Sequence, residues 1–270
     1  MLLTKGAIKI EFNDKLILKN LNVNYGSLKV LKDINMILKP GEVNTLIGLN
    51  GAGKTTLLKS ICGILNNVSG DIFFNNIDLR KLKDKERGKM ISFIPQNIHS
   101  NQDYSVEDIV TMGVTPYLSM FEMPCSEHYE KARDILKELN LYHLKDKCIG
   151  DLSGGERRMV YLGRVLMQRS KIVLLDEPNT FLDCVRQHDL FKFMIKLIKE
   201  KNLISLFTLH DINLALRYSD KIYILNENTI TQVIDCRKEG YQQKLINELR
   251  RVYSKDFSIM ETKVGPMLIY

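Results

Sequence analysis

The chain has 270 residues, of which 44% are hydrophobic and 26% charged, a balance typical of one globular domain with room for a subdomain. The net charge of +7 comes from scattered lysines without a block of like charges, which argues against nucleic acid as a partner. Five cysteines, none in a Cys-x-x-Cys pair, argue against a disulfide framework or a zinc site and favour a reducing compartment.

The first third of the chain predicts strands around one helix. Alternating apolar and polar residues are typical of half-exposed antiparallel strands, whereas apolar residues at helical spacing predict a helix. The expected strands cover 7–12, part of 16–23, 43–47, 71–74 and 90–94, and the expected helix covers 55–65.

Between 97 and 150 the pattern becomes helical. Ser105 and Asp108 are spaced as a capping box that opens a helix, and residues 127–139 form an amphipathic helix. We interpret this region as a helical insert in a core made of 1–96 and 151–235.

After the insert, apolar strands alternate with helices, which predicts a parallel sheet covered on both faces. The fold class is therefore α/β, with an antiparallel β part at the N-terminus. A C-terminal extension, 236–270, predicts a helix at 241–252 and one or two strands, and its role is not evident. The expected strands are 172–175, 204–209 and 222–225, and the expected helices are 157–168, 186–199 and 212–218.

A glycine-rich loop follows the strand expected at 43–47. Its sequence is Gly48-Leu49-Asn50-Gly51-Ala52-Gly53-Lys54-Thr55, followed by Thr56. This pattern between a strand and a helix is typical of a phosphate-binding loop, because the glycines let backbone amides turn inward and the helix adds its positive end. We expect Lys54 to reach the β- and γ-phosphates of a nucleotide and Thr55 to offer its hydroxyl to Mg²⁺.

A second motif is the apolar strand that ends in Asp176-Glu177-Pro178. Ligands bind at the carboxyl ends of the strands in open parallel sheets. We therefore expect Asp176 to hold Mg²⁺, directly or through water, and Glu177 to act as the general base on the attacking water. By itself such a strand end is equally well a solvated turn, but the phosphate loop upstream favours a site.

The third motif is Leu152-Ser153-Gly154-Gly155-Glu156, which opens a helix 23 residues before Asp176. Alone, Ser-Gly-Gly would be a plain turn. Together with the phosphate loop and the acidic strand, in this order, it resembles the ATP-binding-cassette (ABC) ATPases over nearly the whole chain from Leu18 to about Asn226.

The resemblance implies a role for each matching residue. Tyr25 stacks on adenine, Gln96 senses Mg²⁺ and the attacking water, and His210 contacts the γ-phosphate. The Ser153 corner caps the nucleotide bound to a second copy of the chain, and Asp183 lies across the dimer seam. The implied catalytic residues are Glu177, His210, Lys54 and Gln96, and the implied Mg²⁺ ligands are Thr55, Gln96 and Asp176. The implied ATP contacts are Tyr25, Gly48, Asn50, Gly51, Ala52, Gly53, Lys54, Thr55, Thr56, Ser153, Gly154, Gly155 and Asp183.

The chain departs from the family pattern at two places. Asn179-Thr180-Phe181 stands where Thr-Ser-His or similar residues are usual, which affects the expected dimer seam. Leu49 replaces a common proline in the phosphate loop. Neither change removes a group expected to touch phosphate, and Glu177 is intact, which argues against a non-enzymatic regulatory subunit.

Two stretches, 105–117 and 209–216, resemble the ATPases of importers for iron-siderophore, haem and cobalamin complexes, although Gly113-Val114 replaces the usual Gly-Arg. The resemblance implies a head-to-tail dimer on a separate membrane permease, working with a substrate-binding protein. Because no apolar run approaches about 18 residues and Met1–Lys5 lacks a secretory pattern, we expect a cytoplasmic chain on the inner face of the membrane. The alternative is a cassette ATPase of iron–sulfur assembly without a membrane partner. Repair and translation ATPases fit less well, because this chain has neither a long coiled-coil insertion nor a second cassette.

Overall fold

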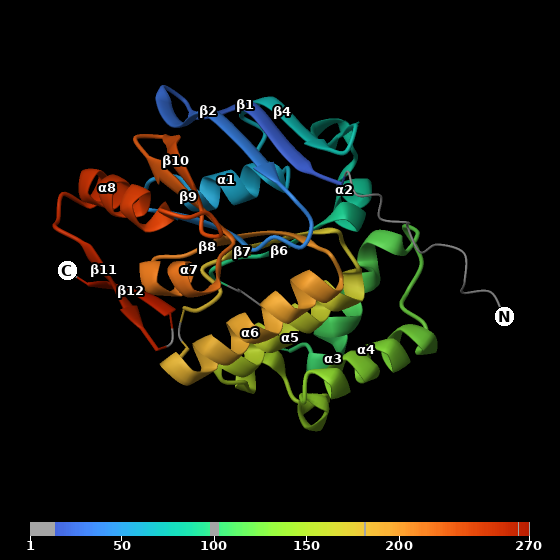
Figure 1. The fold of residues 1–270 in the computed structure, drawn as a ribbon. Coiled ribbons are helices and arrows are strands. Elements are labelled where there is room, and N and C mark those ends of the chain that lie inside the picture. The colour runs from blue at the N-terminus through green and yellow to red at the C-terminus, as the bar shows by residue number, and fades with distance from the viewer. Residues whose placement is uncertain (1–13, 98–102, 181, 264, 270) are drawn as a thin grey trace.

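The computed structural model describes residues 14–97, 103–180, 182–263 and 265–269 (Figure 1). The strands are β1 Leu16–Tyr25, β2 Leu28–Leu38, β3 Asn44–Gly48, β4 Val68–Phe74, β5 Ile77–Asp78, β6 Ile91–Ile94, β7 Ile172–Asp176, β8 Ile204–Thr208, β9 Lys221–Asn226, β10 Thr229–Asp235, β11 Ser258–Thr262 and β12 Gly265–Ile269. The α-helices are α1 Lys54–Ile61, α2 Asp84–Met90, α3 Val106–Thr111, α4 Ser126–Glu138, α5 Gly154–Gln168, α6 Cys184–Glu200, α7 Ile212–Tyr218 and α8 Tyr241–Tyr253.

The core is a six-stranded sheet of order β10-β9-β3-β8-β7-β6. The strands from β9 to β6 run parallel, and β10 pairs antiparallel with β9 at one edge. Strands β3, β7 and β8 are buried along their whole length, as parallel strands are when both faces of a sheet are covered. The predicted α/β fold with a parallel core is confirmed.

Alternate residues of each central strand enter two different cores. Leu174 and Leu206 pack with α1 and the antiparallel sheet of order β2-β1-β4-β5. Val173 and Phe207 point to the other face and pack with residues of α5 and α6. Figure 1 shows this layering, with α1 between the two sheets and α5 and α6 on the opposite side of the central sheet. The sheet therefore holds the loops at its carboxyl edge between two packed layers.

Between β6 and β7, helices α3 and α4 pack against each other and against α5. The predicted capping box at Ser105 is confirmed: its hydroxyl oxygen accepts a hydrogen bond from the Asp108 amide at 3.0 Å, and the Asp108 carboxylate accepts from the Ser105 amide at 3.3 Å. The expected amphipathic helix is α4, which buries Ala132 and Leu136. The strand expected at 7–12 lies outside the described residues.

The helix expected at 55–65 is shorter in the structure, where α1 ends at Ile61. Gly63 has φ +68°, and its amide donates to the Ser60 carbonyl at 3.0 Å. A left-handed glycine here terminates the helix, since such a residue lets the chain turn back on the last carbonyls. The sequence interpretation also missed β2, α2 and β10.

The C-terminal extension contains the expected helix, α8, and a hairpin of β11 and β12. Leu245 and Leu249 of α8 are buried in the same core as the residues of α5 and α6. The hairpin is fastened to α7, because the Asn213 side chain accepts from the Leu268 amide at 2.7 Å and donates to its carbonyl at 3.4 Å. The extension is therefore packed onto the core.

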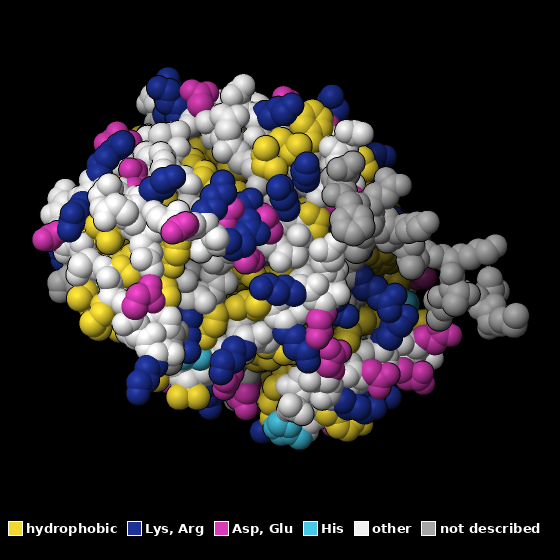
Figure 2. All heavy atoms as spheres, in the orientation of Figure 1, with side chains coloured by type: hydrophobic (Ala, Val, Ile, Leu, Met, Phe, Trp, Pro, Cys, Tyr) yellow, Lys and Arg dark blue, Asp and Glu magenta, His cyan; other side chains and the backbone are white. Residues whose placement is uncertain are grey.

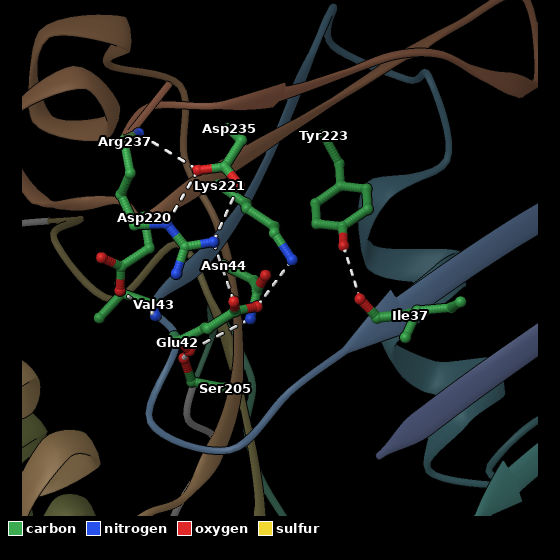
Figure 3. A network of polar contacts seen from close by, with 10 residues as sticks. All are labelled: Ile37, Glu42, Val43, Asn44, Ser205, Asp220, Lys221, Tyr223, Asp235 and Arg237. Carbon is green, nitrogen blue, oxygen red and sulfur yellow. Dashed lines mark hydrogen bonds and ion pairs between the residues drawn. The ribbon is translucent and has the colours of Figure 1, made fainter. Parts of the chain in front are cut away.

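An ion-pair network lies at the amino ends of the parallel strands (Figure 3). The Glu42 carboxylate accepts from Lys221 at 2.8 Å and pairs with Arg237 at 2.9 Å. Arg237 also pairs with Asp235 at 2.8 Å. The Glu42 and Lys221 side chains are only 10% and 14% exposed, whereas Arg237 is 47% exposed. The network ties the start of the extension to the chain segment that enters β3.

Replacing Glu42 with Ala is expected to lower the free energy of unfolding by about 3 kcal/mol, because it leaves the buried Lys221 ammonium without its counter-charge. The matched change Arg237→Ala should cost less than about 1 kcal/mol, since that guanidinium is half exposed. Urea unfolding of both variants measures the difference. Equal losses of unfolding free energy in the two variants would contradict the argument that the buried Lys221 ammonium depends on the Glu42 carboxylate.

Candidate active site

The glycine-rich loop joins β3 to α1 at the carboxyl edge of the central sheet. A Cβ on Gly48 would lie 2.3 Å from the Leu225 carbonyl oxygen. Gly53 has φ +104°, and a Cβ there would lie 2.9 Å from Leu31 of β2. Both positions therefore require glycine, and the loop is held between β9 and β2. The remaining predicted nucleotide contacts in and beside the loop are exposed or half-buried: Asn50, Gly51, Ala52, Thr55 and Thr56.

Lys54 lies inside this loop and is 6% exposed. Its ammonium donates to the Gly48 carbonyl at 2.9 Å and to the Leu49 carbonyl at 3.1 Å. Burial lowers the pKa of Lys54, and the carboxylates of Glu177 and Asp176 partly oppose that shift. The loop thus folds around the buried Lys54 ammonium, which is suited to bind an anionic group.

Asp176 ends β7 and is 1% exposed. Its two carboxylate oxygens accept from the hydroxyls of Thr55 at 2.7 Å and Thr208 at 2.6 Å. Hydroxyl and carboxylate oxygens are the donors that Mg²⁺ prefers. Among the described residues no group of three or more His, Cys, Asp or Glu could hold a metal by itself. The Thr55 and Asp176 oxygens therefore fit an ion that takes its other ligands from phosphates and water.

Glu177 follows Asp176 and brings two further predicted residues together. Its carboxylate accepts from Gln96 Nε2 at 2.5 Å and contacts His210 Nε2. Its backbone has φ 47°, and its amide donates to Thr208 Oγ1 at 2.9 Å. A left-handed conformation costs a non-glycine residue on the order of 1–3 kcal/mol. The surroundings therefore impose the position of this carboxylate.

The Ser-Gly-Gly corner caps α5. The Ser153 hydroxyl oxygen accepts from the Glu156 amide at 3.3 Å, and the hydroxyl donates to the Glu156 carboxylate at 2.6 Å. Hydrogen bonds from Ser153 lower the pKa of Glu156. A Cβ on Gly155 would lie 3.1 Å from the side chain of Leu182 and 3.3 Å from that of Arg186. Asp183, which caps α6, lies beside this corner through Arg186.

The predicted residues therefore fall into two groups. Lys54, Asp176, Glu177, Gln96 and His210 meet at the carboxyl edge of the sheet. Ser153, Gly154, Gly155 and Asp183 form a separate, mostly exposed corner, and no hydrogen bond within the described part of the chain joins that corner to the phosphate loop. Tyr25 is 47% exposed at the end of the β1–β2 hairpin, whose β2 strand packs on Gly53.

Two residues of the site were missed from the sequence. Thr208 accepts from the Glu177 amide and donates to Asp176. Its only sequence signal is a hydroxyl at the end of a mostly apolar strand, two residues before His210. Arg158 of α5 is 5% exposed and donates to backbone carbonyls around Gln96 and Glu177. No pattern marks Arg158, because charged residues are common on helices.

Comparison with known proteins identifies the family. The profile described as "ABC transporter" matches residues 31–180. The probable iron chelatin transport ATP-binding protein of Helicobacter pylori is 37% identical over 78% of this chain and 84% of its own length. The hemin import ATP-binding protein HmuV of Shewanella denitrificans is 32% identical over 93% of this chain and 97% of its own length.

Comparison of the fold with solved structures indicates the same family. A chain of a metal-chelate type ABC transporter in an inward-facing conformation superposes with a TM-score of 0.79 and 28% identity, covering 96% of this chain and 98% of that one. The family match covers the phosphate loop, the Ser-Gly-Gly corner and the acidic strand end that the structure places around the carboxyl edge of the sheet. This chain belongs to the ABC transporter family and is an ATP-binding cassette ATPase.

Proposed function

We propose that this chain is the ATP-hydrolysing subunit of an importer for a metal chelate of the iron-siderophore, haem or cobalamin type. The observation that carries the hydrolytic part is the convergence of Lys54, Thr55, Asp176 and Glu177 at one sheet edge. The importer part is supported by the relatives named for iron chelatin transport and hemin import.

The proposed chemistry is attack of water on the γ-phosphorus of ATP. Glu177 takes the proton from the water as the new oxygen–phosphorus bond forms, and the bond to the β-phosphate oxygen breaks to give ADP and phosphate. Lys54 balances charge on the β- and γ-phosphates. Gln96 and His210 already contact the Glu177 carboxylate, so they are placed to orient the water and to bind the γ-phosphate. Mg²⁺, when held by Thr55 and Asp176 with assistance from Gln96, supplies further charge compensation to the phosphates.

The second half of the nucleotide site comes from another copy of the chain. The α5 N-terminus and the Ser153 hydroxyl are exposed donors suited to an anion, yet within the described residues they make no hydrogen bond to the phosphate loop. A head-to-tail dimer would place this corner, with Asp183 beside it, over the γ-phosphate bound to the partner. Of the predicted seam departure, Phe181 lies outside the described residues.

Replacing Ser153 with Ala is expected to lower kcat by about ten- to a hundredfold while the affinity of the monomer for ATP changes less than about twofold, because the only nucleotide that the serine contacts in this proposal is the partner's. Ser105→Ala is the matched control, since it removes the same kind of capping box, worth about 1 kcal/mol, from α3. Steady-state hydrolysis over a range of protein concentrations measures the effect. A specific activity independent of protein concentration would refute the shared site.

The membrane part of the proposal rests on a partner. Over the described residues, none of the helices combines the length and apolar content needed to cross a bilayer. A groove of about 510 Å³ is lined by Phe93 of β6, Arg164 and Gln168 of α5 and Ile64 after α1. Because β6 leads directly to Gln96, a short helix of a membrane permease in this groove would be coupled to the hydrolytic site. The chain would then lie on the inner face of the membrane.

Figure 2 shows lysine and arginine side chains interspersed with acidic ones over the visible face, with no continuous basic stripe. On the visible face this distribution differs from that of a nucleic-acid surface, which concentrates basic side chains on one face. The proposed partners are the membrane permease and, through it, a substrate-binding protein. We also propose the division into a core of 1–96 and 151–235, a helical insert of 97–150 and an extension of 236–270.

The importer proposal is tested in the cells that make this protein. Deleting its gene should abolish energy-dependent uptake of a labelled ferric siderophore, haem or cobalamin, and expression of the wild-type chain, but not of Glu177→Gln, should restore it. Detergent extracts should contain the chain bound to a polytopic membrane protein. Normal uptake of all three chelates together with loss of iron–sulfur enzyme activity would favour the assembly ATPase instead.

A further inference from the structure

Helix α5 connects the Ser-Gly-Gly corner with the interior of the hydrolytic site. It begins directly after Ser153, and its second turn carries Arg158. Arg158 is 5% exposed, so its charged group is buried below the carboxyl edge of the sheet. A buried guanidinium is costly unless its donors are satisfied, which makes the identity of its acceptors informative.

The acceptors are three backbone carbonyls from two different loops. One terminal nitrogen of Arg158 donates to the Pro95 carbonyl at 3.0 Å. The other donates to the carbonyls of Gln96 at 3.2 Å and Glu177 at 3.4 Å. One side chain therefore joins α5 to the loop after β6 and to the end of β7.

Two of the three residues whose carbonyls Arg158 binds, Gln96 and Glu177, are also joined through their side chains. The Gln96 amide donates to the Glu177 carboxylate at 2.5 Å. Glu177 has the left-handed backbone described above, with its amide bonded to Thr208 and its carbonyl to Arg158. Arg158 thus holds the backbone of both the proposed base and the glutamine that contacts it.

We infer that Arg158 is a positioning residue that transmits the placement of the Ser153 corner to Glu177 and Gln96 of the same subunit. When that corner engages a phosphate on the partner, movement of α5 shifts the carbonyls that Arg158 holds, and the carboxylate of Glu177 moves with them. Each subunit then aligns its own Glu177 only when its Ser153 corner contacts the nucleotide bound to the other subunit. This inference rests on the proposed hydrolysis by a dimer.

The contact geometry requires arginine. Its planar fork presents several N–H groups in fixed directions, which lets one side chain reach carbonyls on both loops. A lysine at this position keeps the charge but has a single nitrogen, and glutamine loses the charge and most of the donors. Replacement by lysine should therefore retain part of the function, whereas replacement by glutamine should lose it.

The test compares Arg158→Gln and Arg158→Lys with wild type in single-turnover and steady-state hydrolysis. Arg158→Gln should lower kcat by about 10- to 100-fold, as a misplaced catalytic group does, with the Kd of a fluorescent ATP analogue within about threefold of wild type. Arg158→Lys should lie between the two. Arg87→Gln is the matched control, because Arg87 is a buried arginine of α2 that also donates to backbone carbonyls, those of Leu82 at 3.0 Å and Leu79 at 3.4 Å.

A double variant separates positioning from general support of the fold. If Arg158 acts through the base, adding Arg158→Gln to Glu177→Gln should not reduce the residual single-turnover rate further, since the residue it positions is already disabled. Two results overturn the inference: a kcat for Arg158→Gln no lower than that of Arg87→Gln, or a full additional loss in the double variant. If Arg158→Gln does not fold, an Arg158→Lys enzyme with wild-type kcat overturns it equally.

These outcomes are distinct from a failure of the proposed function. Wild-type turnover in Glu177→Gln alone would reject the assigned base, whatever Arg158 does. An inactive Glu177→Gln beside an Arg158→Gln that matches the Arg87 control would reject only the positioning role.

Discussion

Replacing Glu177 with Gln should reduce steady-state ATP hydrolysis by about a hundredfold or more, because the amide cannot accept the proton of the attacking water. The substitution keeps the size of the side chain and can still receive the hydrogen bond that Gln96 donates to it at 2.5 Å. ATP should therefore bind and remain intact, and the dimer that it closes should persist. Phosphate release measures the rate, and size-exclusion chromatography with ATP measures the dimer.

The control is Glu200→Gln, which makes the same chemical change at the exposed end of α6. It should hydrolyse ATP at the wild-type rate and show no trapped dimer. Unchanged turnover in Glu177→Gln would remove the general base from the proposed chemistry. An inactive variant that stays monomeric with ATP would instead contradict closure of the dimer by bound nucleotide.

Replacing Lys54 with Ala should weaken ATP binding by at least about tenfold, as expected when a charge-assisted contact to phosphate is lost, and should bring hydrolysis below detection. Lys54 is buried inside the phosphate loop and bonded to its Gly48 and Leu49 carbonyls, so a nucleotide can recruit an amine that is already in place. Titration with a fluorescent ATP analogue measures the affinity.

Lys59→Ala is the matched control, since Lys59 lies on the same short helix in its last turn. It removes the same charge without removing a loop contact, and its ATP affinity should stay within about twofold of wild type. Equal binding by wild type and Lys54→Ala would show that the loop amides alone determine affinity.

The sequence predicted the position of the hydrolytic site because that position depends on topology. Parallel strands present their carboxyl ends at one edge, so the loop after β3, the acids at the end of β7 and His210 after β8 had to converge there. The Ser105 capping box was predictable for a similar reason, since both of its groups belong to one turn.

Contacts between distant segments were not predictable. Thr208 acts through hydrogen bonds to residues at least 31 positions away, and Arg158 through hydrogen bonds to residues at least 19 positions away. The sequence does not indicate which distant residue a hydroxyl or a guanidinium group will bind. The end of α1 is a different case, because Gly63 is a usable stop signal that apolar spacing up to Leu65 obscured. The roles of Tyr25, Ser153 and Asp183 stay predictions, since they depend on nucleotide and on a second subunit.

The fastening of β12 to α7 has a practical consequence for biochemistry. Asn213 follows His210 by three residues and holds Leu268 near the end of the chain. An affinity tag fused after Tyr270 would hang from a strand anchored close to His210, the proposed γ-phosphate contact. Rate constants obtained with such a tag would therefore need a tag-free reference before they are assigned to the enzyme itself.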